Sequence, residues 1–310
     1  MYIDSLTTSA LAGVLRSEVL GARVQEVLQP DRASVALELY AGARRYLTVS
    51  ADPAHEGLDL APDRARRGEG APTPLTLAAR AHLVGARLTA VDQPPWERIL
   101  LLSFQGASRW RIVAEMMGRM ANVILLDGAG TVIAAAHAVT DRMSRARVVL
   151  PGQAYTPPPT PDKLPVERLT EDLAGAWFAA SPPDAAWRQL VRHVLGASPL
   201  VAREAVFRAA GDPEAASGAV DVPSVCDSLH ALLALPDTLA WSPSVARQGD
   251  RVIAYAPYPL THLGSEPGGA AVVEPVASIA DAVAAFLRSR AGTDAYHDAR
   301  RGVADVLESA

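Results

Sequence analysis

The sequence predicts an α+β protein, with a pseudo-symmetric β-sandwich and flanking helices over residues 1–155 and a helical domain after it. Three observations support this fold class. The first 110 residues contain an internal repeat, and a proline-rich segment at residues 156–162 has the composition of a semi-rigid linker. The residues after the linker have apolar side chains at helical spacing.

The repeat consists of Val19-Leu20-Gly21-Ala22-Arg23-Val24, which recurs as Leu83-Val84-Gly85-Ala86-Arg87-Leu88. Each copy reads as a helix followed by strands. In the first copy, apolar residues from Leu11 to Val19 recur at helical spacing, with Thr7, Thr8 or Ser9 available as the N-cap. Residues 34–40 then alternate as in a half-buried strand. Two such units facing each other predict the sandwich.

Three further parts are expected after the linker. Residues 163–240 read as a helix-hairpin-helix domain or a helix-two-turn-helix module, because a helix that begins after Asp184 stops at Gly196-Ala197-Ser198-Pro199 and another begins at Leu200. Residues 241–277 read as return strands. Residues 278–310 read as a helix with heptad-like spacing near its end, so we expect the start of a coiled coil that is cut short.

Composition limits the classes of function. The net charge of −5 argues against a protein coated in basic surface, although it is compatible with a local basic patch. Cys226 is the single cysteine, which excludes an internal disulfide and a cysteine metal site. No apolar run reaches the roughly 20 residues of a membrane span, and residues 1–20 lack a signal-peptide pattern. We therefore expect a cytoplasmic protein without a membrane partner.

Catalytic motifs are absent from the sequence. There is no glycine-rich phosphate loop with lysine, no His-Glu-x-x-His, no nucleophile elbow and no Cys-x-x-Cys. The seven histidines are dispersed, and an isolated histidine is more often structural than a ligand. We expect neither enzymatic activity nor a cofactor nor a metal.

Three local clusters are candidate functional sites, and each has a plainer alternative. Gln93 to Arg98 places the charged pair Glu97-Arg98 before a strand, or is an ordinary exposed turn. In Glu115 to Asn122, three methionines around Gly118-Arg119 could form an adaptable apolar binding surface with one cation. The plainer alternative is that the methionines fill the core next to a turn. Asp141 to Arg147 has three arginines that suit phosphate contacts, or that form a solvated charge run.

Together these segments resemble the N-terminal half of the NFACT family. The resemblance covers Gly85 to Ile99, Glu115-Met116-Met117-Gly118-Arg119, and Ser144 to Tyr155 with its Leu150-Pro151-Gly152. Leu195 to Leu200 resembles the family's helix-hairpin-helix segment, and Ala256-Pro257-Tyr258-Pro259-Leu260 resembles the approach to its coiled coil. The sequence departs from the family pattern at Glu97, where the family has Asp, and at Ala81 and Gly57, where it usually has a cation.

The resemblance implies a fold like that of formamidopyrimidine-DNA glycosylase without its chemistry, because Tyr2-Ile3 stands where that glycosylase has its catalytic Pro-Glu. It implies a module of ribosome-associated quality control that binds tRNA, with alanine tRNA expected, and a large ribosomal subunit carrying peptidyl-tRNA. C-terminal alanine tailing of the nascent chain would follow, with the ribosome forming the bonds. The nucleic-acid-binding residues that it implies are Glu97, Arg98, Arg80, Glu115, Met117, Gly118, Arg119, Arg145 and Arg147.

Two alternatives from other classes stay open. One is a surface adhesin that binds fibronectin, against which the lack of a signal-peptide pattern weighs. The other is a DNA-lesion-binding protein, which rests on analogy of fold alone.

Overall fold

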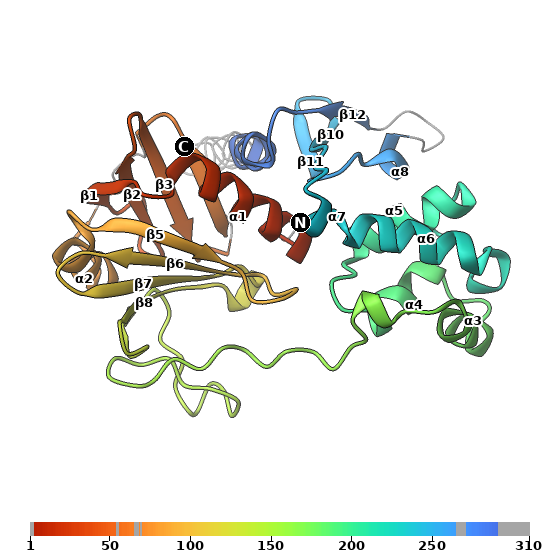
Figure 1. The fold of residues 1–310 in the computed structure, drawn as a ribbon, viewed down its shortest axis with the longest axis horizontal. Coiled ribbons are helices and arrows are strands. Elements are labelled where there is room, and N and C mark those ends of the chain that lie inside the picture. The colour runs from red at the N-terminus through yellow and green to blue at the C-terminus, as the bar shows by residue number, and fades with distance from the viewer. Residues whose placement is uncertain (1–2, 54–55, 65–67, 69, 265–270, 291–310) are drawn as a thin grey trace, which may run out of the picture.

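The computed structural model describes residues 3–53, 56–64, 68, 70–264 and 271–290. Figure 1 shows two parts, a large sheet with its helices and a bundle of helices, joined by an extended linker. A small sheet lies between the two parts on the opposite side from the linker (Figure 1).

The large sheet has nine antiparallel strands in the order β4-β3-β2-β1-β5-β6-β7-β8-β9. The first repeat supplies one half of the sheet and the second repeat supplies the other. The strands are β1 (Arg23–Leu28), β2 (Ser34–Tyr40), β3 (Arg44–Ser50), β4 (Gly57–Ala61), β5 (Arg87–Asp92), β6 (Ile99–Gln105), β7 (Arg109–Glu115), β8 (Asn122–Asp127) and β9 (Val132–Ala135).

The two repeats meet where β1 pairs with β5, and their hydrogen bonds are reciprocal. Gly21 N donates to Leu88 O and Gly85 N donates to Val24 O, both at 2.8 Å. Both glycines have the left-handed φ that follows the end of each repeat's helix, +80° for Gly21 and +84° for Gly85. Equivalent residues thus make equivalent bonds across a local twofold axis, which confirms the internal repeat.

The helix of the first repeat packs on strands of the second, and the helix of the second repeat packs on strands of both. Helix α1 (Ser5–Val19) lies against β5 and β6, and α2 (Pro74–Leu83) lies against β1, β8 and β9. The N-cap of α1 is Asp4, whose side chain accepts from Thr7 N, so the predicted caps at residues 7–9 are wrong. The apolar faces of both helices join the strands in one core.

The predicted sandwich is only partly correct. The two meanders face each other, because β3 approaches β8 and β4 approaches β7. They are nevertheless one hydrogen-bonded sheet rather than two, since the reciprocal pairing of β1 with β5 leaves no free edge between them. Coiling of that single sheet encloses the core.

A helical bundle follows the linker, and the expected helix-hairpin-helix domain is not found among the described residues. Helix α5 packs against both α4 and α6, while α3 packs on α4 and α6. All four contribute to one buried core, so α4 and α5 are not a separate helical pair. The elements are η2 (Val166–Arg168), α3 (Glu171–Ala180), α4 (Ala186–His193), α5 (Pro199–Ala210), η3 (Ser217–Ala219), α6 (Val222–Leu233) and α7 (Leu235–Thr238).

The small sheet has the order β11-β10-β12, with β10 (Ser244–Gln248), β11 (Arg251–Ala256) and β12 (Val272–Pro275). Alternate residues of β11 join different cores: Tyr255 packs with the large sheet, and Ala254 packs with the bundle. Helix α8 (Thr261–Gly264) lies within a segment that the sequence predicted as extended. Residues 279–290 are helical, and the predicted coiled-coil start, residues 291–310, lies outside the described residues.

Replacing a buried side chain near the seam should be costly. Leu88→Ala empties a position that is 0% exposed, so we expect the free energy of unfolding to fall by about 2–5 kcal/mol in chemical denaturation. Leu77→Ala is the matched control, because Leu77 is 53% exposed and should change stability by less than about 0.5 kcal/mol. Equal losses in the two variants would contradict this account of the core.

Candidate nucleic-acid interface

A cleft of about 960 Å³ lies between the large sheet and the helical bundle. One wall is formed by the turn before β6 and by Met117, and the other by the α4–α5 turn and the start of α5. The Pro-rich linker and the β11–α8 region complete the lining. The cleft therefore gathers residues that are far apart in the sequence.

The turn before β6 is fixed from two sides. Gln93 Nε2 donates to Ser5 O at 2.9 Å and to Glu97 O at 2.8 Å, which ties the turn to the start of α1. Trp96 has a φ of +58°, an uncommon conformation for a bulky residue. Its ring packs on Gly196, where an added Cβ would lie 2.5 Å from a ring carbon. Trp96 thus joins the two parts beside Glu97 and Arg98.

Two helix N-termini meet in the same cleft. Asp4 Oδ1 caps α1 by accepting from Thr7 N at 2.8 Å, and Asp4 Oδ2 accepts from Ser198 Oγ at 2.8 Å. The Ser198 hydroxyl also caps α5, because it accepts from Val201 N at 3.2 Å. The partial positive charges of α1 and α5 therefore point toward the cleft, with the Asp4 carboxylate between them.

The cations of the cleft differ in how strongly they are engaged. Lys163 Nζ donates to Val191 O at 2.6 Å, and burial lowers the pKa of Lys163. Arg203 Nε pairs with Glu214 Oε1 at 2.7 Å, and its guanidinium lies 4.1 Å from the centre of the Trp187 ring. The guanidinium of Arg98 makes no hydrogen bond or ion pair within the described part of the chain. Arg98 is therefore the lining arginine available to a ligand.

Glu115 and Arg147 form a buried ion pair. Arg147 Nη1 and Nη2 donate to the two carboxylate oxygens of Glu115 at 2.5 and 2.6 Å, and Tyr155 Oη donates to Glu115 Oε1 at 2.8 Å. The hydrogen bonds that Arg147 donates to Glu115 raise the pKa of Arg147, although burial opposes this rise. Neither charge is presented to solvent, so the structure gives both residues the task of holding the segment around Tyr155 on the sheet.

The other predicted residues are dispersed. Arg80 Nε donates to Val27 O at 3.0 Å, which ties α2 to β1. Gly118 begins the 3₁₀ turn η1 (Gly118–Met120) with a φ of +64°, and Arg119 follows it on the surface. Arg145 is exposed on its loop. Of the nine predicted residues, Glu97, Arg98 and Met117 line the cleft.

Sequence reasoning missed several lining residues. Lys163, Ser198 and Arg203 come from the helical side of the cleft and belong to none of the three clusters. Ser198 before Pro199 was available as a signal, since serine followed by proline is typical of a helix start. The three methionines separate, with Met116 in the core, Met117 in the cleft and Met120 on the surface.

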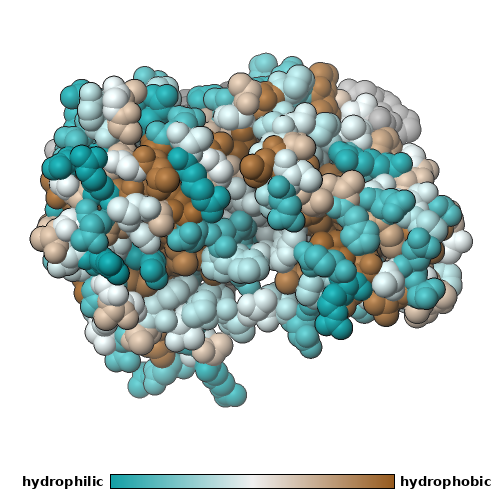
Figure 2. Space-filling view, in the orientation of Figure 1, coloured by the Kyte–Doolittle hydropathy of each residue, from teal (hydrophilic) through white to brown (hydrophobic). Residues whose placement is uncertain are grey.

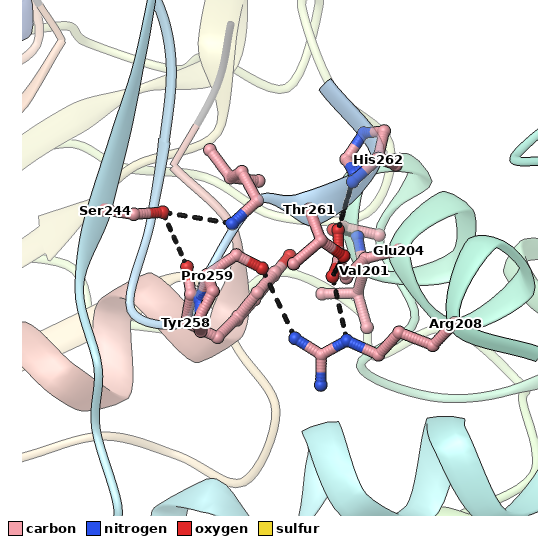
Figure 3. Close-up of polar contacts among 10 residues, drawn as sticks. Val201, Glu204, Arg208, Ser244, Tyr258, Pro259, Thr261 and His262 are labelled. Atoms are coloured by element: carbon pink, nitrogen blue, oxygen red, sulfur yellow. Dashed lines mark hydrogen bonds and ion pairs between the residues drawn. The ribbon is translucent and has the colours of Figure 1, made fainter. Parts of the chain in front are cut away.

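The buried carboxylate of Glu204 in α5 holds the segment around Thr261 and His262 beside the cleft (Figure 3). It accepts from Arg208 Nε at 2.8 Å and from Thr261 Oγ1 at 2.6 Å, and its second oxygen lies 2.7 Å from His262 Nδ1. Burial raises the pKa of Glu204, but the hydrogen bonds from these partners outweigh it and bring the pKa to about 2. The segment that carries His262, which lines the cleft, is thereby held on α5.

Within the described ranges, no cluster of three or more His, Cys, Asp or Glu side chains could hold a metal ion. The same residues include no helix long and apolar enough to cross a membrane. Cys226 is buried, and burial raises its pKa to about 11, so its thiol is protonated at neutral pH.

Comparison with known proteins assigns the chain to a family. The family model for the NFACT N-terminal and middle domains matches residues 4–310. The chain belongs to the NFACT family. The Rqc2 homolog RqcH of Bacillus subtilis is 30% identical over 219 residues, which cover 67% of this chain and 38% of that protein. This NFACT chain therefore spans about two fifths of the length of that relative.

Solved structures agree with the fold. The N-terminal part of the fibronectin/fibrinogen-binding protein of Streptococcus suis is 20% identical, with a TM-score of 0.70, over 92% of this chain and 99% of that one. The fibrinogen binding protein of Staphylococcus aureus is also 20% identical, with a TM-score of 0.71, over 90% and 97% of the two chains. Lactococcus lactis Fpg reaches a TM-score of only 0.33, so the expected likeness to the glycosylase stays a prediction.

The buried ion pair should matter more for stability than its exposed neighbour. Arg147→Ala leaves Glu115 buried without its partner, so we expect the free energy of unfolding to fall by about 3–5 kcal/mol. Arg145→Ala, two residues away and exposed, should change it by less than about 0.5 kcal/mol. Chemical denaturation measures both, and a small loss in Arg147→Ala would show that the pair does not hold the loop.

Glu204 should make stability depend on pH in acid. Its folded pKa of about 2 lies below its ordinary value of 4.5, so its contribution is present above pH 4.5 and is lost as pH falls toward 2. The stability difference between the native protein and Glu204→Gln should shrink by roughly 3 kcal/mol over that range. Glu274→Gln, at an exposed surface pair, should show a nearly constant difference. A constant difference for Glu204→Gln would refute the assignment.

Proposed function

We propose that this chain is the tRNA-binding part of a ribosome-associated quality-control factor, and that the cleft is its tRNA site. The observation that supports the proposal most directly is the pair Glu97-Arg98 in the turn before β6. The Arg98 guanidinium makes no hydrogen bond or ion pair with the described residues, although it interacts electrostatically with the half-buried Glu56. The family and the RqcH relative supply the quality-control context.

The chemistry of the cleft suits RNA. A guanidinium binds a phosphate through two parallel hydrogen bonds, so Arg98 would hold the backbone. The carboxylate of Glu97 would accept hydrogen bonds from a ribose hydroxyl or a base amino group. Met117 adds an adaptable apolar surface against a base or a sugar. The N-termini of α1 and α5 face the same space, where the Asp4 carboxylate already meets their partial positive charge.

The wider function is proposed from the family. In it the factor engages a large ribosomal subunit that carries peptidyl-tRNA, recruits alanine tRNA and supports alanine tailing. We assign the chain no bond-forming step of its own, and the ribosome would join the residues. Because the chain spans 38% of the RqcH relative, contacts made elsewhere in such a protein would contribute to binding of the subunit.

The two other functions have weaker support. The names of the streptococcal and staphylococcal structures concern those proteins, and 20% identity transfers the fold alone. The likeness to Fpg is too distant to support binding of DNA lesions. No observation in the cleft favours either function over RNA binding.

Binding of tRNA by the 310-residue chain should depend on Arg98. We expect saturable binding of alanine tRNA that weakens with salt, and Arg98→Ala should reduce the affinity about tenfold because one charge-assisted contact is lost. The slope of log affinity against log salt should fall by about 1. A fluorescence or filter-binding titration at several salt concentrations measures both.

Arg168→Ala is the matched control, since it removes the same charge from an exposed site that does not line the cleft. It should leave the affinity and the salt slope close to those of the native chain. Equal effects of the two substitutions would mean that only overall charge matters, and the cleft would lose its assignment.

A further inference from the structure

A row of arginines crosses the large sheet at the far end of its strands from the cleft. Successive strand pairings place Arg44 opposite Tyr40, Tyr40 opposite Arg23, and Arg23 opposite Arg87. Arg87 then lies opposite Gln105, and Gln105 opposite Arg109. We call these six residues the arginine row. It runs across β3, β2, β1, β5, β6 and β7, and residues paired in this way lie on one face of a sheet.

The arginine row lies on the outer face. All six residues are exposed, whereas the row beside it, Leu39, Val24, Leu88 and Phe104, is buried in the core. Arg111 adds another exposed cation two residues after Arg109, on the same side of β7. In the face of the molecule that Figure 2 shows, hydrophilic side chains cover much of the sheet part. The six residues of the row are exposed, whereas farther along the same face Glu38 is buried and Glu26 pairs with Arg64 of the segment after β4.

The charges of the row are incompletely balanced. Arg23 and Arg87 face each other directly at the seam, and like charges placed opposite each other destabilise a sheet. Arg44 Nε lies 3.3 Å from Glu38 Oε1, and Asp127 lies with Arg109 and Arg111 around a pocket of about 400 Å³. One oxygen of Asp127 already accepts from two backbone amides of its own turn. A third carboxylate on this face, Glu26, lies opposite Glu38 and pairs with Arg64 from outside the row. The four arginines of the row and Arg111 therefore outnumber the nearby carboxylates Glu38 and Asp127.

Most guanidinium donors of the row are available. Arg87 Nη1 donates to Gly21 O at 2.9 Å, and Arg109 Nε donates to Gln105 Oε1 at 3.3 Å, which holds both side chains in place. Arg23 has no hydrogen bond or ion pair with any described residue. Each guanidinium has five N–H donors, so every arginine of the row keeps donors with which it can bind a phosphate.

We infer that the arginine row is a second RNA-binding surface, which takes the sugar–phosphate backbone of a paired RNA segment. Strands are about 4.8 Å apart, so the row extends over roughly 24 Å, a length along which a nucleic-acid strand presents several phosphates. The row has no cluster of aromatic side chains to stack on bases, so it reads shape and charge rather than sequence. Tyr40 is its single aromatic residue, too little apolar surface for insertion into a membrane.

This surface is distinct from the cleft. Gln105, the last residue of β6, lies seven positions after Arg98, which corresponds to roughly 23 Å along the strand. One RNA could therefore contact both, but neither site requires the other. The inference goes beyond the proposed function, and it stands or falls on its own variants.

The test uses the 310-residue chain, a blunt RNA hairpin with a paired stem as probe, and the double variant Arg23→Ala/Arg87→Ala. We expect hairpin affinity to fall about tenfold and the salt slope to fall by about 2, one for each lost phosphate contact. Arg23→Lys/Arg87→Lys should keep most of the slope, since the charges remain while the forks are lost. The Ala variant should unfold at a denaturant concentration close to that of the native chain, because removal of the repulsive pair offsets loss of the hydrogen bond from Arg87 Nη1 to Gly21 O.

Two controls separate the possible outcomes. Arg168→Ala/Arg251→Ala removes two exposed arginines outside the row and should leave hairpin binding unchanged. Arg98→Ala should weaken tRNA binding while leaving binding of the blunt hairpin close to native, so failure of the cleft and failure of the row can be told apart. Native hairpin binding by Arg23→Ala/Arg87→Ala would overturn the inference. So would a defect of that variant confined to vesicles of anionic lipid.

Discussion

The reciprocal hydrogen bonds between residues 21–24 and 85–88 determine the form of this NFACT chain. They join two meanders into one continuous sheet, so the repeats cannot move as separate layers. They also fix the relation between the ends of the sheet. Gly21 and Gly85 bring the helix ends to the seam, while the opposite ends of β5 and β6 carry the turn that presents Glu97 and Arg98. The positions of the cleft turn and of the arginine row therefore both follow from a single strand pairing.

The cleft depends on a second set of interactions, which hold the helical bundle against the sheet. Asp4 and Ser198 link the starts of α1 and α5, and the Trp96 ring fits against Gly196. Glu204 then fastens the segment around His262 to α5. A positive φ is unfavourable for tryptophan and persists only where the surrounding structure holds the residue in place. The packing of Trp96 on Gly196 supplies that constraint. The turn that carries Arg98 is thus held in place by contacts with both parts of the molecule.

The sequence anticipated elements better than their assembly. The repeat predicted the helix-and-strand order correctly, because its apolar periodicity is local. Apolar periodicity does not indicate which strand edges pair, so it cannot tell whether two meanders form two sheets or one. The predicted sandwich was therefore correct in its facing meanders and wrong in its number of sheets. Glu115 and Arg147 are 32 residues apart, and nothing local indicates that they neutralise each other in the core. Glu97, Arg98 and Met117, which the sequence singled out, line the cleft, and their role in binding stays a prediction. Lys163 and Ser198 reach the cleft only through tertiary packing.

The seam has one more consequence, which concerns symmetry. Gly21 bonds to Leu88, and their repeat equivalents Gly85 and Val24 bond to each other in the same way. Such a reciprocal contact is called isologous, and it is the kind that forms twofold-symmetric dimers. Here both partners are encoded in one polypeptide, so the two halves need not remain identical. One half keeps Ala33-Ser34 at its turn, and the other has Glu97-Arg98. Covalent fusion of a symmetric pair thus permits an asymmetric surface, with a single charged turn where a true dimer would display two.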